Sequence, residues 1–80
     1  MATIIETVPQ QGQRDYLFDN GVDVSILDLG VWEWYDEPND AYYSGCFFVE
    51  DDTVIDYDGI DDLPQEVKTA LEESGYKLDL

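Results

Sequence analysis

The chain has 80 residues, of which 20 are Asp or Glu and three are Lys or Arg, with no His, so its formal net charge is −17. Repulsion among these charges opposes compaction. Repulsion between the acidic chain and other anions makes direct binding to nucleic acid or to an anionic membrane unfavourable. The composition is nevertheless 44% hydrophobic and 14% aromatic, which is too apolar for a disordered acidic tail. We therefore expect a single compact domain over residues 1–80.

The N-terminal part of the chain predicts short strands joined by tight turns. Residues 3–8 are rich in β-branched side chains and form the first expected strand. Asn20-Gly21 lies between two apolar stretches, and this dipeptide is the strongest short-range signal for a hairpin. We expect strands over 14–19 and 22–28, joined by a tight turn at Asn20-Gly21.

The middle of the chain continues this meander. Residues 31–35 form a strand by composition, and the polar turn 36–40 contains Pro38, which cannot serve a central strand. Residues 42–49 show the strongest strand pattern, because six of the eight are aromatic, Val or Cys. An acidic turn then leads to the last strand of the meander, over 53–57.

The helix signal is confined to the C-terminal part. Gly75 suits position C′ after a helix, and Tyr76 suits C″, where it would pack on Leu71. The pattern predicts one helix over about 63–74, followed by a short edge strand at 77–80. We therefore expect an α+β fold, with an antiparallel, twisted sheet of four or five strands and the helix on one face. The apolar stripe of the helix is formed by Leu63, Val67, Ala70 and Leu71.

The residue types present argue against an enzyme. Without His the chain cannot build a Ser-His-Asp triad, a zinc deaminase site or a His-ligated metal site. It has no Gly-rich phosphate loop, and its carboxylates are too abundant to identify an acid–base pair. The single Cys46 has no His to activate it and is expected to be a buried small hydrophobic side chain. We predict no catalytic residues, no cofactor and no dedicated metal site.

Residues 56–62 resemble part of an EF-hand calcium loop. Aligning Gly59 with the glycine of that loop places Val54 at its position 1 and Gln65 at its position 12, and neither side chain suits calcium. The flanks are expected to be a strand and a helix rather than two helices. A weak adventitious divalent site stays open.

The segment 50–62 is a candidate binding surface, because it holds seven carboxylates in thirteen residues. Strand alternation would place Asp56 and Asp58 on one face, and Ile55 and Tyr57 on the opposite face, towards the helix. The two aspartates could then replace phosphates in contacts with a basic protein. A solvated sheet face with a charged turn is the alternative.

The segment 32–37 is the second candidate. Alternation puts Trp32 and Trp34 on one face, and Glu33 and Tyr35 on the other. The Trp pair fits the core under the helix, while aromatic side chains beside acids also suit an interface that binds Arg or Lys. The expected partner-binding residues of both segments are Glu33, Trp34, Tyr35, Asp36, Glu37, Asp40, Tyr43, Glu50, Asp51, Asp52, Asp56, Asp58, Asp61 and Asp62.

The density of negative charge is the strongest indication of a partner. Sixteen acidic residues and no basic one lie between Asp15 and Glu66. A globule of this length is about 30 Å across, so the charge comes to about one per 1.8 Å, against about one per 1.7 Å of axis in duplex DNA. One acidic face could therefore present a field like that of a nucleic acid to a basic protein.

In size, charge and expected fold, the chain resembles the small phage-encoded DNA mimics. That group includes anti-restriction proteins, inhibitors of uracil-DNA glycosylase and several anti-CRISPR proteins. The resemblance covers the whole chain as composition and carries no residue over. It implies a non-enzymatic, stoichiometric inhibitor in the host cytoplasm, which occupies the basic nucleic-acid-binding surface of a host defence or repair complex.

Two other interpretations stay open. The chain could be an acidic protein-binding module unrelated to nucleic acid, or a small domain adapted to molar salt, where the Debye length is about 3 Å. The first residues lack the basic and apolar regions of a signal peptide, and no apolar run reaches membrane-spanning length, so we expect an intracellular protein. Cys46 and an exposed edge strand leave a homodimer open.

Overall fold

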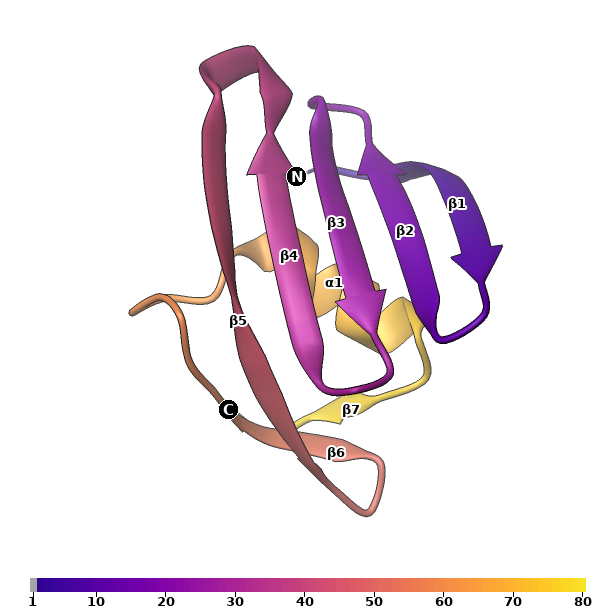
Figure 1. Ribbon diagram of the computed structural model, residues 1–80, viewed down its shortest axis with the longest axis vertical. Helices are drawn as coiled ribbons and strands as arrows, with labels where there is room; N and C mark the ends of the chain where they lie inside the picture. Colours follow the sequence, from indigo (N-terminus) through magenta and orange to yellow (C-terminus); the bar gives the residue numbers. More distant parts are fainter. Residues whose placement is uncertain (1) are drawn as a thin grey trace.

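The strands lie side by side in the same order as in the chain (Figure 1). The computed structural model describes residues 2–80, and over this range it holds a seven-stranded sheet and one α-helix. Neighbouring strands from β1 to β6 are antiparallel, whereas β6 and β7 are parallel. The elements are β1 (Ile4–Gln10), β2 (Gln13–Phe18), β3 (Val22–Leu27), β4 (Val31–Asp36), the 3-10 helix η1 (Glu37–Asn39), β5 (Ala41–Glu50), β6 (Thr53–Tyr57), α1 (Gln65–Glu73) and β7 (Lys77–Leu78).

The α+β class and the single helix near the C-terminus are confirmed, but four or five antiparallel strands are too few. Each expected strand segment forms and joins one curled sheet, β1 and the short β7 included. The sheet is mixed because the chain crosses over through α1 after β6 and returns beside β6 in the same direction. A crossover of this kind, rather than a tight turn, is what parallel pairing requires.

The core lies between α1 and one face of the sheet, and the figure shows the helix behind β2 to β4 (Figure 1). Trp32 and Tyr16 are the largest fully buried side chains, and both satisfy their polar atoms. The indole Nε1 of Trp32 donates to the backbone oxygen of Asp58 at 3.2 Å, and the hydroxyls of Tyr16 and Ser74 are 2.8 Å apart. The helix contributes Val67, Ala70 and Leu71 to this core.

The C-terminal end of α1 follows the sequence prediction. Gly75 adopts a φ of 100° and donates its backbone N–H to the oxygen of Glu72 at 3.0 Å. The N–H of Tyr76 reaches back to the oxygen of Leu71 at 3.1 Å. These two bonds form a Schellman motif, with Gly75 at C′ and Tyr76 at C″, so this prediction is confirmed.

Two predicted boundaries shift for local reasons. The helix begins at Gln65 rather than 63, because Pro64 is its N-cap and has an extended backbone, with ψ at 146°. The β2–β3 hairpin has a three-residue loop, 19–21, rather than a two-residue turn at Asn20-Gly21. Gly21, with a φ of 87°, closes this loop through a bond from its N–H to the oxygen of Phe18. This is the geometry of a turn followed by a left-handed glycine.

Strand β5 makes a close backbone contact with the loop that follows β6. A Cβ built on Gly45 would overlap the carbonyl of Asp58, and a Cβ built on Gly59 would overlap the carbonyl of Ser44. The absence of both side chains lets the loop cross over β5 at this point. The contact holds the segment between β6 and α1 against the sheet.

Candidate partner-binding surface

The sheet face that α1 does not cover is the candidate surface. Residues paired across neighbouring strands share a face, so the register separates this surface from the core face. Leu17, Asp23, Tyr35 and Tyr42 form one cross-strand row, and Asp15, Ser25, Glu33 and Ser44 form the next. We call this the open face, which comprises Glu6, Val8, Gln10, Gln13, Asp15, Leu17, Asp23, Ser25, Leu27, Val31, Glu33, Tyr35, Tyr42, Ser44 and Cys46.

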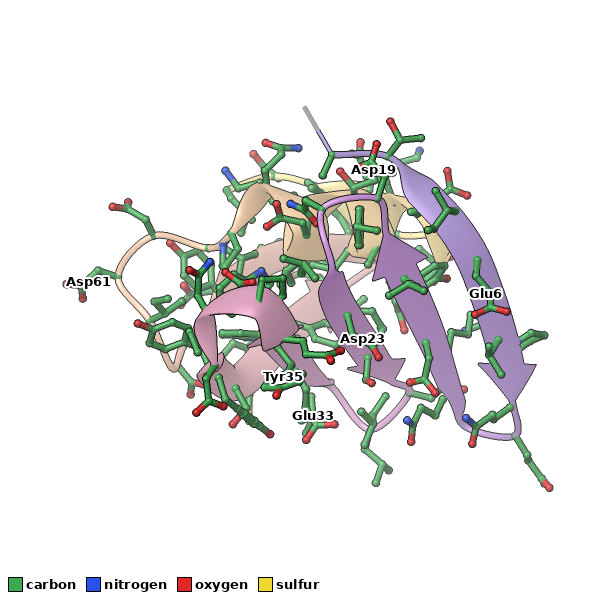
Figure 2. The ribbon with its side chains drawn as sticks, turned by 90° about the horizontal axis from the view of Figure 1, so that it is seen from above. Glu6, Asp19, Asp23, Glu33, Tyr35 and Asp61 are labelled. Carbon is green, nitrogen blue, oxygen red and sulfur yellow. The ribbon has the colours of Figure 1, made fainter. Side chains whose placement is uncertain are left out.

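Carboxylates cluster at the centre of the open face. Figure 2 shows Glu6, Asp23 and Glu33 on three different strands, all on the side of the sheet away from α1. Asp23 is partly desolvated, and this burial, followed by repulsion from Asp15 and from Glu6, raises the pKa of its carboxyl above the ordinary value. Burial and neighbouring negative charge act in the same direction, because each disfavours the ionised form of the Asp23 carboxyl.

Asp15 is held in place by a polar network. Its Oδ1 accepts hydrogen bonds from the Ser25 hydroxyl at 2.6 Å and from Gln13 Nε2 at 2.9 Å, and its Oδ2 accepts one from Gln10 Nε2 at 2.7 Å. All three donors are uncharged. The network therefore fixes the carboxylate on the open face without neutralising it.

Tyrosines flank the carboxylates at the β4–β5 side of the face. Tyr35 and Tyr42 are directly paired across the two strands, and they are 39% and 49% exposed. The Tyr42 hydroxyl donates a hydrogen bond to Glu33 Oε2 at 2.7 Å, and this bond is the main reason that the pKa of Tyr42 is raised. The resulting surface combines flat aromatic area with fixed negative charge, a combination that suits Arg and Lys side chains.

The predicted alternation along β4 is confirmed. Trp32 is buried under the helix, and Trp34 lies on the same side, where its Nε1 donates to Glu66 Oε1 of α1 at 3.0 Å. Tyr43 also lies on that side and packs against Trp34, with the ring centroids 5.5 Å apart and the rings tilted by 38°. Trp34 and Tyr43 are therefore on the face opposite to Glu33 and Tyr35, and these four predicted residues do not form one surface.

The other predicted acidic residues lie at the periphery of the sheet. Asp36, Glu37 and Asp40 surround η1 at the end of the β4–β5 hairpin, where Asn39 Nδ2 donates to Asp36 Oδ2 at 2.7 Å. The second acidic group lies in the β5–β6 turn, at the other end of β5, and Figure 1 shows the two turns far apart. It consists of Glu50, Asp51 and Asp52.

The predicted arrangement of residues 55–58 is confirmed for Tyr57, which packs against the core, and is wrong for Ile55 and Asp58. A register shift between β5 and β6 makes Ile55 an extra residue, so that Val54 and Tyr57, rather than Ile55 and Tyr57, turn to the core. Ile55 is 44% exposed. Asp58 lies beyond the end of β6, and its Oδ1 accepts the N–H of Cys46 at 2.7 Å, so Asp56 and Asp58 are not a matched outward pair. Asp61 and Asp62 follow in the exposed loop before α1.

The acidic side chains that β1, β2 and β3 bring to the open face were not predicted from the sequence. Glu6, Asp15 and Asp23 were not among the predicted binding residues. The signal for Asp23 was present, because it lies between Val22 and Val24 in a strand that alternates buried and exposed positions. Only the pairing register shows that these residues share a face with Glu33 and Tyr35.

Few of the carboxylates meet a cation. Over residues 2–80 the single ion pair joins Arg14 Nη1 and Asp28 Oδ1 at 3.4 Å, and both side chains are about half exposed. Lys68 lies in α1 and Lys77 in β7, so neither belongs to the open face. The negative charge of this face is therefore not compensated by any basic side chain of the described chain.

Cys46 differs from its prediction. It pairs with Val31 on the open face and is exposed, rather than buried in the core. The reason is register, because its neighbour Phe47 takes the core-facing position and is 3% exposed. Within residues 2–80, no three His, Cys, Asp or Glu side chains come together as a metal site would require, and no helix has the length and apolar content to cross a membrane.

Comparison with protein-family models, curated proteins and solved structures finds no match for this chain.

Proposed function

We propose that this protein is a non-enzymatic acidic inhibitor that mimics nucleic acid. In this proposal it blocks the basic nucleic-acid-binding surface of a host defence or repair complex in the host cytoplasm, as anti-CRISPR and anti-restriction proteins do. The open face binds the target. Its carboxylates take the place of phosphates, and Tyr35 and Tyr42 contact the target's basic side chains.

The main support is the uncompensated charge of the open face. Asp15, Asp23 and Glu33 lie on three adjacent strands, and strands in a sheet are about 4.8 Å apart. Fixed neutral donors hold Asp15, and repulsion contributes to the raised pKa of Asp23. A partner that brings Arg or Lys side chains to this face relieves that repulsion, whereas a nucleic acid would increase it.

The rigidity of the surface also favours mimicry. The carboxylates project from a hydrogen-bonded sheet rather than from a loose tail, so binding costs little further ordering. The long-range field of a net charge of −17 would steer a basic partner and make association fast and salt-sensitive. Exposed tyrosines add contact area that phosphates lack, and this area provides specificity among basic proteins.

Competition with nucleic acid tests the proposal. The protein is immobilised, exposed to host-cell lysate, and eluted first with duplex DNA or RNA and then with salt. We expect a nucleic-acid-binding protein in the first elution, and inhibition of its nuclease or repair activity by the free protein at a one-to-one ratio. Partners that nucleic acid cannot displace would instead identify a plain acidic binding module.

A variant that lacks two of the negative charges of the open face makes the test specific. The double substitution Asp23→Asn with Glu33→Gln keeps the shape of the face and removes two charges. We expect it to weaken binding at least about tenfold, because hydrogen-bonded charge pairs in interfaces contribute about 2 kcal/mol or more. The matched control is Asp79→Asn with Glu72→Gln, which removes two charges outside this face. Equal weakening by both variants would mean that net charge alone determines binding.

A further inference from the structure

An open groove of about 470 Å³ lies at the end of the molecule where β3 turns into β4. The β3–β4 loop forms one side, and the β5–β6 hairpin forms the other. Figure 1 shows both segments at the lower end of the view. Its lining includes Asp28, Leu29, Phe47, Val49, Asp52 and Tyr76.

Apolar side chains share the lining of the groove with polar atoms, including those of Asp28 and Asp52. Phe47 and Tyr76 pack edge to face with ring centroids 5.4 Å apart, and Phe47 belongs to the core. Leu29 projects from the loop and is 93% exposed, while Phe48 and Val49 are 47% and 42% exposed. A folded chain of this size gains nothing by leaving these side chains in water, and exposed apolar patches commonly mark interaction sites.

The rim of the groove carries unequal charge. Asp28 is engaged by Arg14, whereas no described Lys or Arg nitrogen lies within 4.0 Å of the Asp52 carboxylate. Asp52 continues into Asp51 and Glu50, so one side of the rim is strongly acidic. A second copy of this chain is a poor occupant, because it would bring another seventeen negative charges and no basic segment. The rim therefore favours a basic partner.

We propose that this groove receives one large apolar side chain of a protein partner, next to a Lys or Arg that pairs with Asp52. The anchor packs on Tyr76, which covers the buried Phe47, and lies between Leu29 and Val49. This arrangement has the features of an interface hot spot, with an aromatic or aliphatic anchor in a pocket and charge at its rim. The choice of a basic partner rests on the proposed function, but the groove is separate from the open face.

A short peptide titration tests the groove directly. The probe is the blocked peptide Lys-Trp-Lys, followed by ¹⁵N–¹H NMR, with Lys-Ala-Lys and Glu-Trp-Glu as controls. We expect Lys-Trp-Lys to shift the amide signals of Gly30, Phe47 and Val49 saturably. Lys-Ala-Lys should give diffuse shifts among acidic residues, because it lacks the anchor, and Glu-Trp-Glu should be repelled.

Variants in the groove complete the test. Leu29→Ser should weaken Lys-Trp-Lys binding about fivefold, through loss of part of an apolar contact. Ile5→Ser on β1 is the matched control, because Ile5 is also exposed, at 63%, and lies outside the groove. Asp52→Asn should weaken binding and leave the fold intact, since Asn tolerates the left-handed backbone found there.

Three results would overturn the inference: no binding of Lys-Trp-Lys, equal shifts with Lys-Ala-Lys, or an unchanged affinity in Leu29→Ser. None of these depends on whether nucleic acid displaces the partner from the open face. Conversely, binding of the peptide in the groove would not support nucleic-acid mimicry if DNA and RNA fail to displace the partners of the protein. The two proposals can therefore fail separately.

Discussion

The carboxylate of Asp58 accepts a hydrogen bond from the backbone N–H of Cys46 at 2.7 Å. The backbone N–H of Asp58 also donates to the oxygen of Cys46 at 3.0 Å. Asp58→Ala should therefore destabilise the protein by about 1 kcal/mol, the usual contribution of such a hydrogen bond. Urea unfolding measures the loss.

Asp56 provides the control for this prediction. Within residues 2–80 its carboxylate accepts a single hydrogen bond, from the N–H of the next residue, Tyr57, and Asp56→Ala removes the same charge. We expect a change in the free energy of unfolding of less than about 0.5 kcal/mol for it. Reversing the charge at Asp58 would remove the hydrogen bond from the N–H of Cys46 to the Asp58 carboxylate. A test of binding should therefore reverse the charge at Asp56 alone. Equal losses in the two alanine variants would show that the Asp58 contact has no structural role.

Gly45→Ala should disrupt the crossing of β5 and the loop at Asp58. The added Cβ would overlap backbone atoms of Asp58 and Gly59, which cannot move aside as a side chain can. We expect a loss of about 3 kcal/mol or more, at the upper end of overpacking effects. Gly12→Ala is the comparison, since its Cβ would meet nothing within 4 Å and only its φ of 78° opposes the change. A thermal shift for Gly45→Ala no larger than for Gly12→Ala would contradict the close contact.

The β5–β6 turn can be stabilised by substitution. Asp51 and Asp52 both have positive φ, 52° and 61°, as the two central residues of a type I′ turn do. Asn-Gly is the preferred pair in this turn, because left-handed backbone costs about 1–2 kcal/mol for most residues and little for Gly. Asp51→Asn with Asp52→Gly should therefore raise the free energy of unfolding by about 1 kcal/mol, measured with urea. Substituting Asn-Gly for Asp61 and Asp62, where no positive φ occurs, should give no gain.

Local sequence signals predicted the elements well because each depends on neighbouring residues. The Schellman ending at Gly75 and the alternation of Trp32 and Trp34 with Glu33 and Tyr35 follow from backbone geometry alone. The number of strands was underestimated because the pairing of β1 and β7 is not encoded locally. Strand β7 has only two residues, and its pairing with β6 depends on the position in space at which α1 ends.

The candidate surface was only partly predictable for the same reason. The density of acidic residues favoured the segment 50–62, but the structure places most of those carboxylates in turns and loops, with Glu50 at the end of β5 and Asp56 within β6. The acidic residues at the centre of the open face are isolated in the sequence and lie on separate strands. Only the pairing register of the strands places Asp15, Asp23 and Glu33 on one face. The register shift at Ile55 also places Val54 instead of Ile55 on the core side, while Tyr57 keeps its predicted side, and no feature of the sequence indicates the shift.

Asp23→Asn should stabilise the protein at neutral pH. Burial and then repulsion from Asp15 and Glu6 raise the pKa of Asp23, so the folded state binds its proton more tightly than the unfolded state. The stability contributed by this group is thus present below the ordinary carboxyl pKa and is lost as pH rises through the raised value. The variant avoids that loss, so it should be more stable by a few tenths of a kcal/mol at pH 7, as expected for exposed charges. The gain should vanish at about pH 3, where Asp23 is protonated. A gain that persists there, or that also appears in Asp79→Asn, would argue against a local repulsion.

The salt dependence of folding separates the proposed function from adaptation to a saline solvent. At about 20 mM NaCl the Debye length is roughly 20 Å, so charges interact across most of a molecule that measures 34 × 27 × 22 Å. The continuous core between α1 and the sheet should nevertheless hold the fold, and we expect cooperative thermal unfolding by circular dichroism in this buffer. About 2 M NaCl screens the repulsion and should raise the Tm by several degrees. The double variant Asp23→Asn with Glu33→Gln should show a smaller rise, because part of the repulsion is already removed.

A chain that is unfolded at low salt and folds only near molar salt would show that its acidity is an adaptation to a saline solvent. The charge of the open face would then no longer indicate a basic partner.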